Sequence, residues 1–219
     1  MNLIKSTGTF SFYTIISRIL GYFRDIMIAV FLGTSFLADV FFVAFRIPNT
    51  FRRLFAEGTF NAAFVPNYTS KLIKGKNQSN KFANEVFNIL FLILLILTLV
   101  AQIFMPGLVG LLAPGFVENS EKIELATKLT RITFPFLMLV CLSSFFSAIL
   151  NSHNKFAAAS AAPIILNVVL IVVLLFGKFL DDELVYYLSY GVSLGGLIQL
   201  IFLYKFVIKY YSPKFNFKI

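Results

Sequence analysis

Long uncharged stretches alternate with short charged segments along most of this chain. Four of these stretches cover residues 86–117, 132–152, 156–177 and 184–204. A membrane helix needs about 20 predominantly apolar residues, so each stretch is long enough to cross a bilayer. Residues 6–66 are long enough for two more spans, although several charges interrupt them.

The pattern therefore predicts an all-α polytopic membrane protein with six transmembrane helices. We expect a turn at Gly33–Thr34–Ser35 and a break in the second span near Pro48, because proline lacks the N–H that a helix needs. The expected domain is a six-helix lobe over residues 1–211, followed by a cytoplasmic tail over 212–219. Its spans are placed at about 8–33, 36–66, 84–112, 123–151, 156–177 and 184–208.

Composition supports this class and removes several others. Hydrophobic residues make up 58% of the 219 residues and charged residues 13%, whereas a soluble domain has about 25% charge. One cysteine and one histidine leave no disulfide framework and no metal cluster. Nucleophile, zinc and P-loop motifs are absent from the sequence, so we expect neither an enzyme nor a cofactor. His153 is expected to be solvated in a short loop.

Membrane topology explains most of the net charge of +9. In the six-span arrangement, lysines gather in the loops of one side and acids on the other, which places the N-terminus and residue 219 in the cytoplasm. This placement leaves no support for nucleic-acid binding. The cytoplasmic set is Lys5, Lys71, Lys74, Lys76, Lys81, Lys155, Lys205, Lys209, Lys214 and Lys218; the opposite set is Glu118, Glu121, Glu124, Asp181, Asp182 and Glu183, with Lys122 and Lys178 nearby.

Charges inside the first two spans have no such explanation. They are Arg18, Arg24, Asp25, Asp39, Arg46, Arg52, Arg53 and Glu57. A charge facing lipid at the bilayer centre costs about 2.5–3.5 kcal/mol, so these side chains must face a wet cavity or one another. Five arginines exceed three acids, which leaves guanidinium groups for an anion. Because a guanidinium fork matches phosphate oxygens, a phosphate or pyrophosphate is the favoured guest.

Helical spacing supports a lined cavity but leaves an alternative open. Asp39, Arg46, Arg53 and Glu57 lie near one stripe of the second span. Arg53 and Glu57 also have the spacing of an internal i,i+4 ion pair, so any single arginine can be a strut instead of a ligand.

Polar residues and a glycine pattern in the later spans allow more than one interpretation. Asn151, Asn167 and Gln199 are candidates for interhelical hydrogen bonds or for cavity lining. Gly191 and Gly195 form a G-x-x-x-G pattern that allows close helix approach.

The sequence resembles the MurJ (MviN) lipid II flippase family in several specific segments. These are Ser17-Arg18-Ile19-Leu20-Gly21-Tyr22-Phe23-Arg24-Asp25, Phe31-Leu32-Gly33, Ala38-Asp39, Phe42-Val43-Ala44-Phe45-Arg46-Ile47-Pro48-Asn49, Phe51-Arg52-Arg53-Leu54-Phe55-Ala56-Glu57-Gly58 and Ala113-Pro114-Gly115-Phe116. The resemblance implies one lobe of a MOP-type (MATE-like) transporter of the bacterial inner membrane. It also implies that the protein flips an undecaprenyl-pyrophosphate-linked peptidoglycan precursor, for cell-wall biogenesis, by alternating access.

The same resemblance assigns roles to single residues. Arg18, Arg24 and Arg52 match cavity arginines that hold the pyrophosphate. Asp25, Asp39, Arg46, Arg53 and Glu57 match positions of gating or cavity support. The chain corresponds to the first lobe, so we expect a missing C-terminal lobe, in a longer protein or as a partner chain. Alternative functions are export of another lipid-linked oligosaccharide and a non-transporting membrane scaffold.

Overall fold

The computed structural model describes residues 3–56, 59–177 and 183–215; for residues 3–7, 51–56 and 59 it describes the backbone alone. Within these ranges the regular structure is helical. The helices are α1 (Leu3–Leu32), α2 (Phe36–Ala56), α3 (Thr59–Lys74), α4 (Lys76–Ile103), α5 (Met105–Leu112), the 3₁₀ turn η1 (Pro114–Phe116), α6 (Ser120–Thr133), α7 (Pro135–Ser152), α8 (Phe156–Phe176) and α9 (Leu184–Val207).

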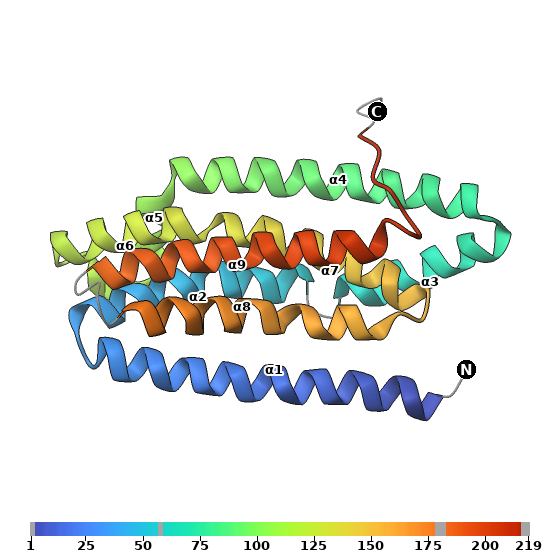
Figure 1. Ribbon diagram of the computed structural model, residues 1–219. Coiled ribbons are helices and arrows are strands. Elements are labelled where there is room, and N and C mark those ends of the chain that lie inside the picture. The colour runs from blue at the N-terminus through green and yellow to red at the C-terminus, as the bar shows by residue number, and fades with distance from the viewer. Residues whose placement is uncertain (1–2, 57–58, 178–182, 216–219) are drawn as a thin grey trace.

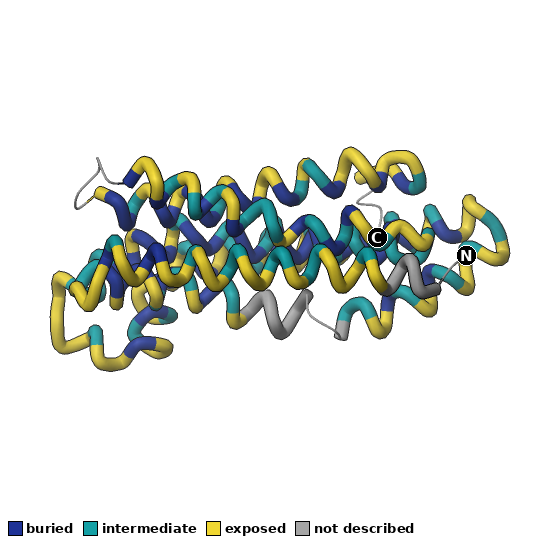
Figure 2. Tube along the Cα trace, turned by 60° about the horizontal axis from the view of Figure 1, so that its bottom comes forward, coloured by how far each residue is buried: buried dark blue, intermediate teal, exposed yellow. Residues whose placement is uncertain are grey.

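The long helices run side by side in one elongated bundle (Figure 1). α7 is its centre, because it packs against α2, α3, α4, α8 and α9 and most of its residues are buried. α1 lies at the edge of the bundle and packs mainly on α8. Buried positions face the middle of the bundle and exposed positions face outward (Figure 2).

The expected boundaries require several corrections. The expected second span, 36–66, is two helices, α2 and α3, and α3 continues to Lys74. The expected third and fourth spans are also divided, into α4 with α5 and into α6 with α7. The divisions of the third and fourth expected spans lie beside Pro106 and Pro135, which stand in the first turn of α5 and α7, where proline is well tolerated.

The expected break at Pro48 is wrong, because α2 continues through this residue. Pro48 leaves the carbonyl of Ala44, four residues earlier, without its helical donor. The Thr133 hydroxyl from α6 donates to that carbonyl at 2.7 Å in a buried position. A neighbouring helix therefore satisfies the freed group, as a proline within a membrane helix requires.

Pro135 is supported in the same way. It deprives the Arg131 carbonyl of a donor, and the side-chain amide of Gln102 in α4 donates to this oxygen at 2.9 Å. Polar side chains that carry no charge thus compensate two prolines from across a helix interface.

Gly191 and Gly195 of the G-x-x-x-G pattern both lie against α8, and Gly196 beside them lies against α7. A Cβ added at Gly191 would lie 3.2 Å from Leu170 Cδ2. A Cβ added at Gly195 would lie 2.8 Å from Leu166 Cδ1 of α8. A Cβ added at Gly196 would lie 2.6 Å from Phe136 Cδ2 of α7. The distances at Gly195 and Gly196 are too short for real side chains, so these glycines permit the observed contact of α9 with α8 and α7.

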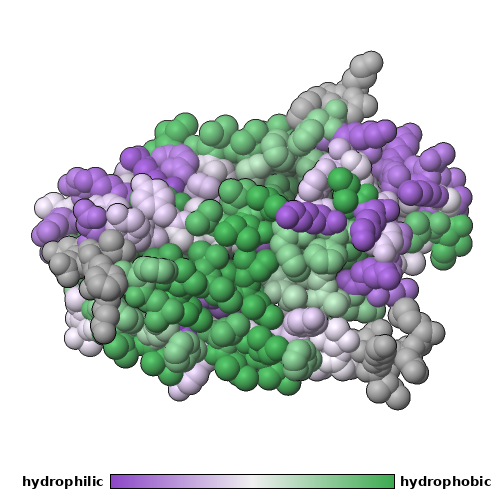
Figure 3. All heavy atoms as spheres, viewed as in Figure 1, coloured by the Kyte–Doolittle hydropathy of each residue, from purple (hydrophilic) through white to green (hydrophobic). Residues whose placement is uncertain are grey.

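Four helical segments in the described part of the chain are long and apolar enough to span a membrane: Lys76–Ile103, Ser120–Ser152, Phe156–Phe176 and Leu184–Val207. They overlap the last four expected spans, but Lys76–Ile103 begins and ends eight or nine residues before the expected span 84–112. α1 and α2, which carry the intramembrane charges, do not reach this threshold. Hydrophobic atoms form a broad band across the middle of the bundle, and polar atoms gather at its two ends (Figure 3).

The loops that were expected on one side of the membrane meet at one end of the bundle. Tyr68 of α3 lies 3.2 Å from His153 in the loop after α7, and the His153 ring stacks on Tyr210 after α9. His153 was expected to be solvated, but these two rings partly cover it. Near this end, the backbone N–H of Lys214 donates to Asn84 of α4.

Candidate functional site

Two adjoining hollows lie beside Arg24. The larger, of about 330 Å³, is between α1 and α2 and is lined by Arg24, Asp25, Phe42, Phe45, Arg46, Asn49 and Thr50. The smaller, of about 200 Å³, extends towards α7, α8 and α9 and is lined by Arg24, Phe45, Asn49, Phe136, Val140, Pro163, Leu166, Asn167 and Gln199. Because Arg24, Phe45 and Asn49 line both, the two hollows form one site with Arg24 between its parts.

Three hydrogen bonds hold the Arg24 guanidinium. Its Nε and Nη2 donate to Asp25 Oδ1 at 3.0 and 2.6 Å, and its Nη1 donates to Asn167 Oδ1 at 2.7 Å. Asn167 is itself fixed, since its Nδ2 donates to the Ser17 carbonyl of α1 at 2.9 Å. The charged end of Arg24 also lies over the Phe45 ring, 5.5 Å from its centroid.

Arg24 keeps part of its hydrogen-bonding capacity for a guest. A guanidinium has five N–H groups, and the three bonds to Asp25 and Asn167 leave two of them without a partner among the described residues. The Arg24 side chain is 13% exposed, whereas that of Asp25 is 59% exposed. The guanidinium is therefore held in one orientation, away from bulk water, with donors to spare.

The described side chains that line the larger hollow carry more positive than negative charge. Arg46 lines it and has no ion-pair partner among the residues whose side chains the structure describes. Two arginines and one aspartate leave one positive charge. This supports the expectation that the arginines exceed their counter-ions, although Arg24 itself is paired with Asp25.

Other residues from the expected site lie elsewhere. Arg18 is exposed on α1 and lines neither hollow. Asp39, at the start of α2, lies 3.4 Å from Lys122 of α6 and does not meet Arg24. Arg52 and Arg53 belong to α2, but their side chains, and all of Glu57, lie outside the described residues.

Sequence reasoning had left the roles of Asn167 and Gln199 open, and both line the smaller hollow. Asn167 both lines the hollow and forms interhelical hydrogen bonds, which join α8 to Ser17 and Arg24 of α1. Phe45 and Asn49 were missed. Their signal was present in the sequence, since Asn49 lies three residues after Arg46 and hence near it on the same helix.

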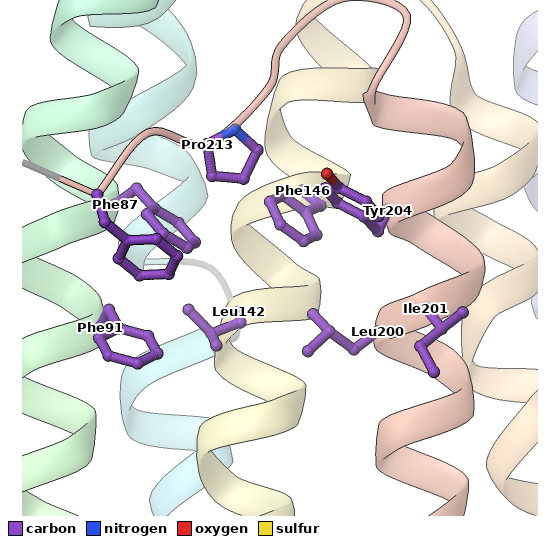
Figure 4. Close-up of a pocket in the computed structure, with 9 residues that line it drawn as sticks. Phe87, Phe91, Leu142, Phe146, Leu200, Ile201, Tyr204 and Pro213 are labelled. Carbon is purple, nitrogen blue, oxygen red and sulfur yellow. The ribbon is translucent and has the colours of Figure 1, made fainter.

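A third hollow, of about 340 Å³, is almost wholly apolar. Figure 4 shows its lining from α4, α7, α9 and the following segment: Phe87, Phe91, Leu142, Phe146, Leu200, Ile201, Tyr204, Pro213 and Phe215. None of these nine residues is charged, so this hollow lacks a group that holds an anion. Among the described residues, no group of three or more His, Cys, Asp or Glu is placed to bind a metal ion.

Residues 28–218 match the family model of the lipid II flippase MurJ. The chain belongs to the MurJ lipid II flippase family. This confirms the family that the motifs around Arg24 and Pro48 indicated.

Curated relatives and solved structures agree with this assignment. A probable lipid II flippase MurJ of Rhizobium tropici is 43% identical over 93% of this chain and 39% of its own length. One of Rickettsia prowazekii is 40% identical over 93% of this chain and 40% of its own length. The chain thus spans about two fifths of the length of these relatives.

The structure of a lipid II flippase MurJ in an inward closed conformation matches with a TM-score of 0.80 and 31% identity, over 95% of this chain and 43% of that one. A MOP superfamily transporter from Pyrococcus furiosus matches with a TM-score of 0.67 and 16% identity, over 96% of this chain and 47% of that one, which shows the fold alone. The fold is therefore the all-α lobe of a MOP-type transporter, and the chain is a multi-pass membrane protein.

Proposed function

We propose that this chain is the N-terminal lobe of a flippase for lipid II and that the hollow beside Arg24 binds the diphosphate of the lipid. The observation that carries this proposal is an oriented guanidinium on the wall of the hollow, with two N–H groups that have no partner among the described residues. The relatives of the chain are named as probable lipid II flippases, which supports this choice of ligand.

The chemistry of the site suits a diphosphate better than a single carboxylate. Guanidinium remains protonated when water is scarce, and its planar N–H groups match phosphate oxygens. Arg24 and Arg46 present two such groups to the larger hollow. The polyprenyl chain would stay in lipid while the headgroup enters the site.

The other residues from the resemblance keep their roles as part of this proposal. Arg18 and Arg52 join Arg24 as ligands when the site is occupied. Asp25 orients Arg24, as its ion pair supports. Asp39, Arg46, Arg53 and Glu57 support the cavity or its gating.

We further infer a transporter, not an enzyme, in the bacterial inner membrane, with the N-terminus and residue 219 in the cytoplasm. A second lobe, working with this one in alternating access, would expose the site first to one leaflet and then to the other. The membrane potential can bias such a cycle, because moving one elementary charge across it is worth about 2.3 kcal/mol per 100 mV.

Replacing Arg24 tests the proposal. The complete gene product carrying Arg24→Ala should fail to sustain growth of cells depleted of their own flippase, while its amount in the membrane stays normal. Arg131→Ala is the matched control, because Arg131 is exposed on α6 and lines neither hollow.

Binding to purified protein in lipid nanodiscs gives the second readout. Losing hydrogen bonds to a charged ligand should weaken lipid II binding by about tenfold or more in Arg24→Ala. Normal growth with Arg24→Ala, or unchanged lipid II binding, would refute the assignment of Arg24. A wild-type chain that binds no lipid II would instead favour a membrane scaffold.

A further inference from the structure

The smaller hollow differs in chemistry from the larger one. Apart from Arg24 on the shared wall, its polar lining consists of the side-chain amides of Asn49, Asn167 and Gln199. Its remaining lining is apolar and includes the rings of Phe45 and Phe136. The site therefore has a charged part at Arg24 and Arg46 and an uncharged, amide-lined part behind Arg24.

The side-chain amide of Gln199 lines this hollow without a hydrogen-bond partner among the described residues. Gln199 is 7% exposed. Asn167, in contrast, uses its oxygen for Arg24 and its nitrogen for Ser17. Since the Gln199 side chain lines the hollow and keeps both its donor and its acceptor, it is placed to bond a group that enters the hollow.

The packing of α9 brings Gln199 to this position. Gly195 and Gly196, one turn earlier, allow α9 to approach α8 and α7 so closely that a Cβ at either glycine would clash. Gln199 thereby lies in the same hollow as Phe136 of α7 and Leu166 of α8. The close approach of three helices thus creates the small amide-lined space.

We propose that the smaller hollow is a subsite for the sugar next to the diphosphate of the bound lipid, and that Gln199 is a specificity-determining residue that hydrogen-bonds it. This inference rests on the proposed function. Sugar hydroxyl and acetamido groups donate and accept hydrogen bonds, as an amide does. The rings of Phe45 and Phe136 offer apolar surface to the C–H face of a sugar.

The size of the hollow limits what it holds. Its volume of about 200 Å³ equals about six or seven waters at their liquid volume of about 30 Å³ each. A single sugar ring is of this order, whereas a whole disaccharide–peptide headgroup is much larger. The rest of the headgroup therefore extends out of the lobe.

Two lipids separate the contribution of the sugar from that of the diphosphate. We suggest measuring binding of lipid II and of undecaprenyl diphosphate, which lacks the sugar, to the chain in nanodiscs. Gln199→Met keeps the length of the side chain but removes the amide. It should weaken lipid II binding by about three- to tenfold and change undecaprenyl diphosphate binding by less than about twofold.

Gln78→Met is the matched control, because Gln78 is exposed near the start of α4; it should leave both affinities unchanged. Gln199→Leu serves as a second variant if thermal unfolding shows that the methionine variant is not folded. An equal loss for both lipids, or no loss for lipid II, would overturn the subsite. Arg24→Gln should weaken the binding of both lipids. If the wild-type chain binds both lipids and Gln199→Met changes neither affinity, the subsite is refuted but the diphosphate site is not.

Discussion

The N–H groups of Arg24 are divided between protein partners and the hollow beside it. Asp25 and Asn167 take three N–H groups and fix the plane of the guanidinium. An arginine without these partners would lose more side-chain entropy when it captures an anion. In the proposed site, the ion pair therefore favours binding of an anion by orienting Arg24, even though it lowers the positive charge.

His153 shows a different effect of packing on a single residue. Burial, and to a lesser degree the charge of Lys76, lowers the pKa of His153 below its ordinary value of 6.5. The unfolded chain therefore binds more protons than the native chain just below pH 6.5, and native stability falls as the pH drops from 6.5 towards the lowered pKa. We expect the thermal midpoint in detergent to decrease between pH 7.5 and 5.5, measured by circular dichroism.

His153→Gln keeps a polar side chain near Tyr68 without the titration. This variant should show a flatter dependence of the thermal midpoint on pH over the same range. Parallel curves for wild type and variant would mean that other groups cause the loss of stability.

The sequence indicated the kind of site better than it indicated which residues line it. Charges at bilayer depth could be recognised because their cost in lipid is large. The hydrogen bond from Arg24 to Asn167 could not be recognised, because the two residues are 143 positions apart in the chain. Asp39 shares a helical stripe with Arg46, but their separation of seven residues corresponds to about 10 Å along the helix axis. Asp39 therefore lies beside Lys122, whereas Arg46 lines the larger hollow.

The helices depend on each other for backbone hydrogen bonds. α2 remains helical across Pro48 because α6 supplies the hydroxyl of Thr133 to the Ala44 carbonyl. The sequence shows the proline but not its distant donor, and for this reason the expected break was wrong. That each segment is helical, in contrast, could be predicted from its own apolar pattern, which does not depend on the helices packed against it.

Thr133→Val should destabilise the chain by about 1–3 kcal/mol, because the buried Ala44 carbonyl loses its donor. In a Pro48→Ala background, the new N–H can serve this carbonyl, so the same substitution should cost less than about 1 kcal/mol. Unfolding titrations of the four proteins form a double-mutant cycle that measures this coupling.

Thr130→Val is the control for this cycle. The Thr130 hydroxyl donates to Ala126 within its own helix, where that carbonyl already has a helical donor. Its cost should be the same with proline or alanine at position 48. Equal costs of Thr133→Val in both backgrounds would show that the hydroxyl does not compensate Pro48.

The two ends of the bundle differ in charge, and this difference has a consequence for orientation in the membrane. Lys76, Lys155 and Lys214 belong to the end where the N-terminus lies, whereas Glu118 and Glu183 belong to the other (Figure 1). Short loops rich in lysine remain in the cytoplasm. The fold brings together at each end the loops that the charge pattern had assigned to one side, although these loops are far apart in sequence.

Thiol labelling of the whole molecule tests this orientation. Glu118→Cys should react with a membrane-impermeant maleimide in intact spheroplasts, whereas Lys155→Cys should react after permeabilisation alone. Glu118 and Lys155 are both exposed. The native Cys141 is buried at 2% exposure, and a Cys141→Ala background removes its thiol from the assay. Labelling of Lys155→Cys in intact spheroplasts would contradict this orientation.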